Sequence, residues 1–209
     1  MGANKPKDLG VKYTKANYDS YVQKAQTEIT LVSAGSDPGK SVKYSGQKTL
    51  SEIFSQEDIS ARLNYANWKY MPVTNTQVRI NNDGTVEFSA NVIMNQIPGF
   101  VAYTGLGKYS LEDLNKGLKY INLLKVNPPI YVKFKAGTTD NKVDLDVQKI
   151  EIGKFSLPLD QLDVDSTLKQ ITENVFTKTA GLTVKSADFS KGLMKFEGTV
   201  PERMEIESN

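Results

Sequence analysis

The stretch that most resembles a catalytic motif is GSDPGKS at residues 35–41. It is one residue shorter than the phosphate-binding loop G-x-x-x-x-G-K-[ST]. That loop holds phosphate because its backbone amides and the N-terminus of the helix that follows point at the anion. Here residues 42–46, VKYSG, show no helical pattern. We therefore interpret residues 33–41 as a surface loop.

Two pairs of aspartates have a spacing that acid–base or metal chemistry could use, namely Asp144 with Asp146 and Asp163 with Asp165. The first pair lies on a predicted strand opposite lysine residues. The second pair flanks a predicted helix start, where acidic side chains complement the helix dipole. Structural roles explain both pairs, so neither predicts catalysis.

The composition removes the commonest catalytic and metal-binding groups. The 209 residues include no histidine and no cysteine, which excludes an imidazole base, a thiolate nucleophile and a disulfide. Asn82 and Asp83 supply too few oxygen ligands for calcium, and no motif marks a Ser–Lys dyad. Basic and acidic residues are interspersed with a net charge of +2, unlike a nucleic-acid-binding surface. We predict no enzyme activity, metal, cofactor or nucleic-acid partner.

The clearest structural pattern is a β-hairpin around the Asn-Asp-Gly turn at 82–84. A three-residue turn pairs Ile80 with Val86 and Arg79 with Glu87, which gives one apolar and one polar face. A two-residue turn would mix the two faces. We expect the glycine of this turn to adopt a left-handed conformation.

A second hairpin is predicted at 130–152. Pairing Ala136 with Val143 keeps the apolar residues of both strands on one face. The alternation shifts around Lys149, which indicates a β-bulge.

A third hairpin is predicted at 182–200. A turn at 190–192 pairs Lys185 with Glu197 but places Ser186 opposite Phe196 on the inner face.

Helical stripes precede these hairpins, with predicted starts at Thr14, Ser55, Ser110 and about residue 160. The apolar segment 95–109 is interpreted as a loop that is either a lid, a contact patch or a packed Ω-loop. We expect one domain over residues 1–209, with 1–12 and 201–209 as loose tails.

Several segments together resemble small bacterial extracytoplasmic or membrane-anchored proteins related to the tubular lipid-binding (TULIP) superfamily. They are LSEIFSQEDISARLN at 50–64, QVRINNDGTVEFS at 77–89, and KIEIGKFSLPL at 149–159 before a long helix. The resemblance covers about residues 50–200. It implies a long helix held in a curved antiparallel sheet, an apolar groove for acyl chains, and no catalytic residues. The polar residues 1–7 are consistent with an export or anchor segment before them, although no cysteine is present for a lipoprotein anchor.

The predicted fold is α+β, with a long, strongly curved antiparallel sheet built from helix–hairpin units and wrapped around one or more amphipathic helices. The predicted function is non-catalytic binding or carriage of a lipid or other apolar ligand outside the cytoplasm. The alternative is a cell-envelope interaction module of the same fold, without a cavity, that contacts a membrane surface or an envelope protein. The residues predicted to line the ligand cavity are Ile59, Leu63, Val86, Phe88, Val92, Phe100, Tyr103, Leu114, Leu118, Ile121, Leu168, Ile171 and Val175.

Overall fold

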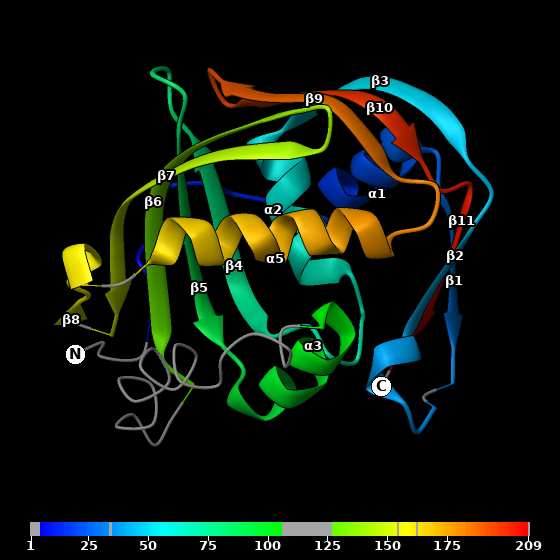
Figure 1. The fold of residues 1–209 in the computed structure, drawn as a ribbon, viewed down its shortest axis with the longest axis horizontal. Helices are drawn as coiled ribbons and strands as arrows, with labels where there is room; N and C mark the ends of the chain where they lie inside the picture. Colours follow the sequence, from blue (N-terminus) through cyan, green and yellow to red (C-terminus); the bar gives the residue numbers. More distant parts are fainter. Residues whose placement is uncertain (1–4, 34, 106–126, 154, 162, 209) are drawn as a thin grey trace.

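The computed structural model describes residues 5–33, 35–105, 127–153, 155–161 and 163–208 (Figure 1). Over these residues the fold is α+β, with four α-helices and eleven strands in two largely antiparallel sheets, which confirms the predicted class. The helices are α1 (Lys15–Ala25), α2 (Gln56–Tyr65), α3 (Ile97–Thr104) and α5 (Val164–Lys178). The strands are β1 (Glu28–Val32), β2 (Val42–Ser45), β3 (Lys48–Ser55), β4 (Val73–Ile80), β5 (Thr85–Val92), β6 (Pro129–Thr139), β7 (Lys142–Ile152), β8 (Phe155–Ser156), β9 (Thr183–Ser190), β10 (Leu193–Val200) and β11 (Arg203–Glu207).

Local sequence sets the starts of the first two helices. Thr14 precedes α1, and its amide donates to Asn17 Oδ1 at 2.9 Å. Ser55 precedes α2 in a capping box, where Ser55 Oγ accepts from the amide of Asp58 and Asp58 Oδ2 accepts from the amide of Ser55, both at 3.1 Å. The predicted helix that begins at Ser110 lies outside the described residues. No helix in the described part of the chain is both long and apolar enough to cross a membrane.

Strand β6 organises the eight-stranded sheet because it pairs along both edges. One edge pairs with β7 over most of its length. The other edge pairs first with β5 and then, from Gly137 to Thr139, with β9. The sheet therefore divides at β6 into two arms, one made of β5 and β4 and the other of β9, β10 and β3.

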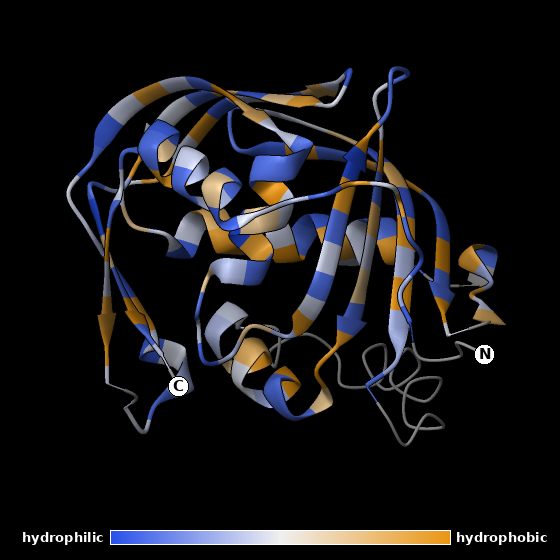
Figure 2. Cartoon of the chain, turned by 180° about the vertical axis from the view of Figure 1, so that it is seen from behind, coloured by the Kyte–Doolittle hydropathy of each residue, from blue (hydrophilic) through white to orange (hydrophobic). Residues whose placement is uncertain are grey.

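The first hairpin has the predicted register. Ile80 pairs with Val86 and Arg79 with Glu87. Gly84 has a φ of +81° at the end of the turn, which is the left-handed conformation expected there. Figure 2 shows the resulting alternation of hydrophilic and hydrophobic residues along the strands.

The predicted register of the second hairpin is wrong by two residues, since Ala136 pairs with Leu145 and not with Val143. The strands are joined by a two-residue turn in which Asp140 and Asn141 have φ values of 49° and 61°. These residue types tolerate the left-handed conformation that such a turn requires. The predicted bulge is confirmed, because Lys133 pairs with Lys149 whereas the next residue, Phe134, pairs with Val147, which leaves Gln148 unpaired in the ladder.

The predicted register of the third hairpin is wrong by one residue. Its turn consists of Lys191 and Gly192 alone, so Ala187 and not Ser186 lies opposite Phe196. A β-bulge then restores the predicted ion pair, in which Lys185 Nζ lies 2.6 Å from Glu197 Oε1. All three hairpins thus place an apolar row on the same inner face of the sheet.

The two predicted loose tails are also corrected. Leu9 and Val11 are buried against Tyr131 on the outer face of the sheet. Residues 203–207 form β11, which pairs in parallel with β1 and antiparallel with β2 and buries Ile206. Both segments are short and rich in charge, so the apolar residues that anchor them were too few to form a periodic pattern.

Helices α1, α2 and α5 pack on the inner face of the sheet. α1 packs against β3 and α2, α2 packs against β4, and α5 packs against β7. Figure 1 shows α5 lying across the sheet, with α1 and α2 near the arm formed by β9, β10 and β3. The positions of α1, α2 and α5 decide whether the inner face is filled or left open.

Candidate functional site

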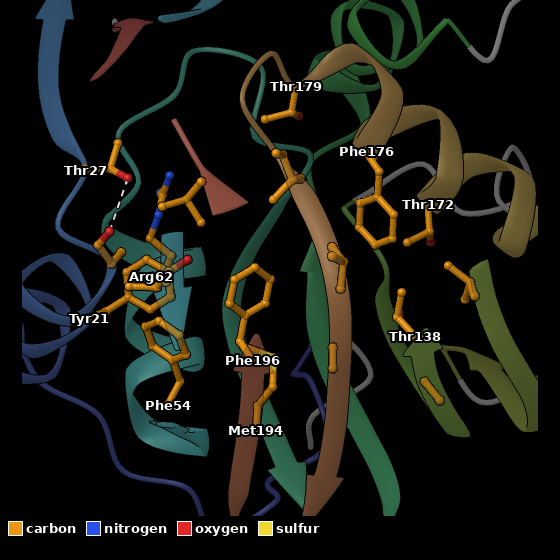
Figure 3. Close-up of a pocket in the computed structure, with 18 of the residues that line it drawn as sticks. Tyr21, Thr27, Phe54, Arg62, Thr138, Thr172, Phe176, Thr179, Met194 and Phe196 are labelled. Carbon is orange, nitrogen blue, oxygen red and sulfur yellow. Dashed lines mark hydrogen bonds between the residues drawn. The ribbon is translucent and has the colours of Figure 1, made fainter. Parts of the chain in front are cut away.

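A cavity of about 690 Å³ lies between α5, α1 and the inner face of both sheet arms (Figure 3). This volume falls within the range of roughly 300–1,000 Å³ that is usual for small-molecule sites. The lining comes from all three hairpins and from β1, β2, β3 and β11. The cavity is therefore a product of the whole fold and not of one motif.

The lining is mainly aromatic and aliphatic. Six phenylalanines contribute, five from the sheet and one from α5: Phe54, Phe88, Phe134, Phe189, Phe196 and Phe176. Small residues between them leave the space open, among them Ala136 on β6 and Ala187 on β9. Tyr21 of α1 stacks on Phe54, with ring centroids 4.9 Å apart.

Two carboxylates hold α5 on the edge of β7. Asp165 Oδ1 accepts from the amide of Val147 at 3.0 Å, and Glu173 Oε1 accepts from the amide of Val143 at 3.1 Å. These bonds satisfy backbone donors of β7 that no neighbouring strand reaches there. They also fix the rotation of α5 about its axis. Asp165, one of the aspartates considered for catalysis, thus has a structural role.

The helix face that α5 turns toward the cavity carries Leu168, Thr172 and Phe176, and the C-cap residue Thr179 also lines the cavity. Thr172 Oγ1 donates to the carbonyl of Leu168 at 2.9 Å, and Thr179 Oγ1 donates to the carbonyl of Val175 at 2.7 Å. Because both hydroxyls are bonded within the helix, they add little polarity to the cavity.

Arg62 of α2 is the only charged residue among those that line the cavity in the described structure. Its Nη2 lies 3.8 Å from Met204 Sδ, and its Cζ lies 5.8 Å from the ring centroid of Tyr21. No carboxylate of the described residues lies within ion-pair distance of this guanidinium. Figure 3 shows Arg62 beside Tyr21, across the cavity from Phe176 and Thr172.

An aromatic cluster lies at the rim near β2. Trp68 packs against Tyr103, with ring centroids 4.9 Å apart, and against Phe100, at 6.1 Å. The hydroxyl groups of Tyr103 and Tyr44 are 2.5 Å apart, and Tyr44 also lines the cavity. Burial, together with the neighbouring Tyr44, raises the pKa of Tyr103 well above its ordinary value.

The segment predicted as a loop at 95–109 is instead largely helical, as far as it is described. Ile97–Thr104 form α3, and Gly105 ends it with a φ of +74°. Gly99 is required inside this helix because a Cβ there would lie 2.0 Å from the ring of Tyr70. The helix has only eight residues and contains a proline, so the sequence shows no helical periodicity that would have predicted it.

The residues predicted to line the cavity are placed in several ways. Phe88 and Leu168 line it. Ile59, Leu63 and Val86 pack in the adjoining core between α2, β4 and β5, and Val92 is buried on β5. Phe100 and Tyr103 belong to the aromatic cluster, and Ile171 and Val175 on α5 are not among the lining residues. Leu114, Leu118 and Ile121 lie outside the described residues.

Sequence reasoning missed most of the sheet residues of the cavity and all of its polar ones. Phe54 and Phe196 could have been found, because each lies on an apolar row of a strand. Arg62 could not, because it occupies an ordinary polar position in an amphipathic helix.

The other candidate chemistry has structural explanations. At 35–41 a short 3-10 turn, Pro38–Lys40, is followed by strand β2 and not by a helix. No three acidic residues in the described part of the chain gather closely enough to hold a metal ion. Comparison of the chain with protein-family models, curated proteins and solved structures finds no match. The geometry of the cavity therefore carries the functional argument.

Proposed function

We propose that the protein binds a lipid or another apolar ligand in this cavity and does not change it chemically. The observation that carries the proposal is an open space of about 690 Å³ lined mainly by phenylalanine and aliphatic side chains. Apolar side chains normally close on one another, because contact removes their surface from water. A large apolar space that stays open is typical of a protein with an apolar ligand.

The finer architecture expected from the sequence belongs to the same proposal. The two sheet arms begin with β5 and β9, which pair with the same edge of β6. Helix α5 lies across the inner face of these arms. We picture one sheet curving around α5, so that the ligand occupies the space between helix and sheet. The location outside the cytoplasm, which the family resemblance implies, is also part of this proposal.

The energetics favour a long hydrocarbon chain. Each buried methylene contributes about 0.8 kcal/mol, so ten methylenes contribute roughly 8 kcal/mol. The loss of translational and rotational freedom on association costs about 4–15 kcal/mol. Short apolar molecules should therefore bind weakly, and affinity should rise steeply with chain length.

The first test is native mass spectrometry of the purified protein, before and after organic extraction. We expect an apolar mass that leaves on extraction, and uptake of an added long-chain fatty acid by the extracted protein. A protein that carries no ligand and takes up none would overturn the proposal and favour the interaction module.

A pair of tryptophan variants on β6 tests the site itself. Ala136 lines the cavity, whereas its neighbour Lys135 points to the opposite face and is exposed. Ala136→Trp should fill the cavity and reduce uptake of a fluorescent long-chain fatty acid at least tenfold. Lys135→Trp should leave uptake unchanged. Equal uptake by both folded variants would place the ligand elsewhere.

A further inference from the structure

Arg62 has an unusual environment for a guanidinium beside an apolar cavity. Its five N–H donors suit a planar oxyanion, yet its closest described partners are the thioether of Met204 and the ring of Tyr21. A thioether is a weak acceptor, and a ring face offers only a cation–π contact. The strongest interaction that this side chain could make is therefore left open.

The charged groups around Arg62 show why it has no ion-pair partner among the described residues. Asp58 precedes it by four residues on α2, which is the favourable order for an ion pair within a helix. Asp58 Oδ2 instead accepts from Lys24 Nζ at 2.6 Å and from the amide of Ser55 at 3.1 Å. Its side chain is only 3 % exposed, so these bonds are well shielded from water.

Two acidic side chains on the neighbouring strands β1 and β11 are also engaged. Glu28 on β1 pairs with Arg203 on β11 at 3.2 Å, with both side chains largely exposed. Glu205 on β11 lies 3.9 Å from Lys43 on β2. The charge of Arg62 is therefore the one that the described walls of the cavity leave unmatched.

We propose that the ligand is an amphiphile with a single anionic oxygen head group, a carboxylate or a phosphate, held by Arg62. This inference rests on the proposed function, because it assigns the two ends of a ligand in the same cavity. The head group lies at the end formed by α1, α2 and β11, against Arg62 and Tyr21. The hydrocarbon tail extends between the sheet and α5 toward Phe176 (Figure 3).

Such a ligand would place an anion against Arg62 and a hydrocarbon chain against the apolar lining. A carboxylate can accept two parallel hydrogen bonds from a guanidinium, and such charge-assisted bonds are roughly twice as strong as neutral ones. A neutral chain of the same length would fill the apolar part and leave Arg62 unpaired. The structure thus predicts a preference for the acid over the corresponding alcohol.

The test compares three ligands of equal chain length, a fatty acid, an alkyl phosphate and a fatty alcohol, by titration calorimetry on the extracted protein. We expect the acid or the phosphate to bind about 10- to 100-fold more tightly than the alcohol, as one charge-assisted contact would give. Which of the two binds more tightly identifies the head group. Equal affinity for all three would overturn the assignment of Arg62 but leave the proposed function standing. No binding of any of them would overturn both.

Variants of Arg62 test whether this residue causes the preference for the anionic ligand. Arg62→Met keeps an unbranched side chain and removes the charge, so it should lower affinity for the anionic ligand about 10- to 100-fold and change that for the alcohol less than about threefold. Arg62→Lys should recover part of the loss, because a point charge replaces the planar fork. Arg203→Met, an exposed site with the same change in charge, is the matched control and should bind as the wild type does. If Arg62→Met binds acid and alcohol as the wild type does, Arg62 is not the head-group site. If Arg62→Met does not fold, Arg62→Lys decides: a reduced preference for the acid supports the assignment, and an unchanged preference overturns it.

Discussion

Replacing Glu87 by glutamine should remove a large part of the pH dependence of stability. Glu87 is 5 % exposed on the outer face of the sheet, beneath the N-terminal segment. It accepts hydrogen bonds from Tyr131 Oη at 2.7 Å, from Asn81 Nδ2 at 3.1 Å and from Arg79 Nε at 3.0 Å. Burial alone would raise the pKa of this carboxyl, but the three hydrogen bonds and the charge of Arg79 outweigh it and lower the pKa to about 2.

The magnitude follows from linkage between protonation and folding. The ordinary pKa of 4.5 applies to the unfolded chain and about 2 to the folded one. A pKa difference of about 2.5 at 1.36 kcal/mol per unit gives about 3 kcal/mol of stabilisation at neutral pH. Because the folded pKa is the lower one, this stabilisation is fully present above pH 4.5 and is lost as the pH falls through about 2. At pH 3 about 1 kcal/mol remains, so roughly 2 kcal/mol disappears between pH 7 and pH 3.

Urea unfolding of the wild type and of Glu87→Gln at pH 7 and pH 3 measures this difference. We expect the variant to be less stable by about 3 kcal/mol at pH 7 and by only about 1 kcal/mol at pH 3. The wild-type curve contains contributions from every acidic group, so the informative quantity is the difference between the two proteins at each pH.

Glu197→Gln is the matched control, because Glu197 also forms a cross-strand ion pair on a hairpin. That pair, with Lys185, is exposed, and water screens it. The control should show little change at either pH. If Glu87→Gln differs from the wild type by the same amount at both values, the ionised carboxylate is not the stabilising form and the reasoning fails.

Three further variants test other features of the fold by urea unfolding at neutral pH. Gly198→Ala should cost about 3 kcal/mol, because a Cβ there would lie 2.0 Å from the carbonyl oxygen of Thr183 and force the bulge open. Asn141→Ala should cost about 2 kcal/mol, since it removes the acceptor that lies 2.6 Å from the amide of Val184 and strains a residue with a φ of 61°; Asn141→Gly should restore the part due to strain. Asp58→Ala should cost about 2 kcal/mol, because it removes the acceptor of the Ser55 amide in the capping box of α2 and the ion-pair partner of Lys24. In each case an unchanged unfolding midpoint would contradict the stated contact.

The register of a hairpin could be predicted only where the residue pattern distinguished one register from another. The wrong register of the β4–β5 hairpin would have mixed apolar and charged residues on one face, so the pattern alone excluded it. In the β6–β7 hairpin, Ala136 lies on the same face whether it pairs with Val143 or with Leu145. A shift of two residues leaves every side chain on its own face, so the pattern could not choose between them. The two-residue left-handed turn at Asp140 and Asn141 sets the register in which Ala136 pairs with Leu145.

The cavity residues on α5 illustrate the same limit for a helix. Helix α5 carries a regular apolar stripe made of Leu168, Ile171 and Val175. This stripe alone does not determine which of its residues faces the sheet. The bonds from Asp165 and Glu173 to β7 settle the rotation, so that Leu168 but not Ile171 lines the cavity. Those partners are distant in the chain and leave no periodic signal.

The sequence by itself determined the α+β class, three hairpins, the caps of the first two helices and the lack of His or Cys chemistry. These properties depend on residue type and on neighbours a few positions away. The tertiary structure decided whether the apolar rows met as a packed core or stayed apart around a cavity. That outcome depends on the double pairing of β6, on the small residues Ala136 and Ala187, and on the docking of α5. It also decided that Arg62 faces this space with no carboxylate partner among the described residues, because Lys24 from another helix holds Asp58, the acidic residue one turn before Arg62 on α2.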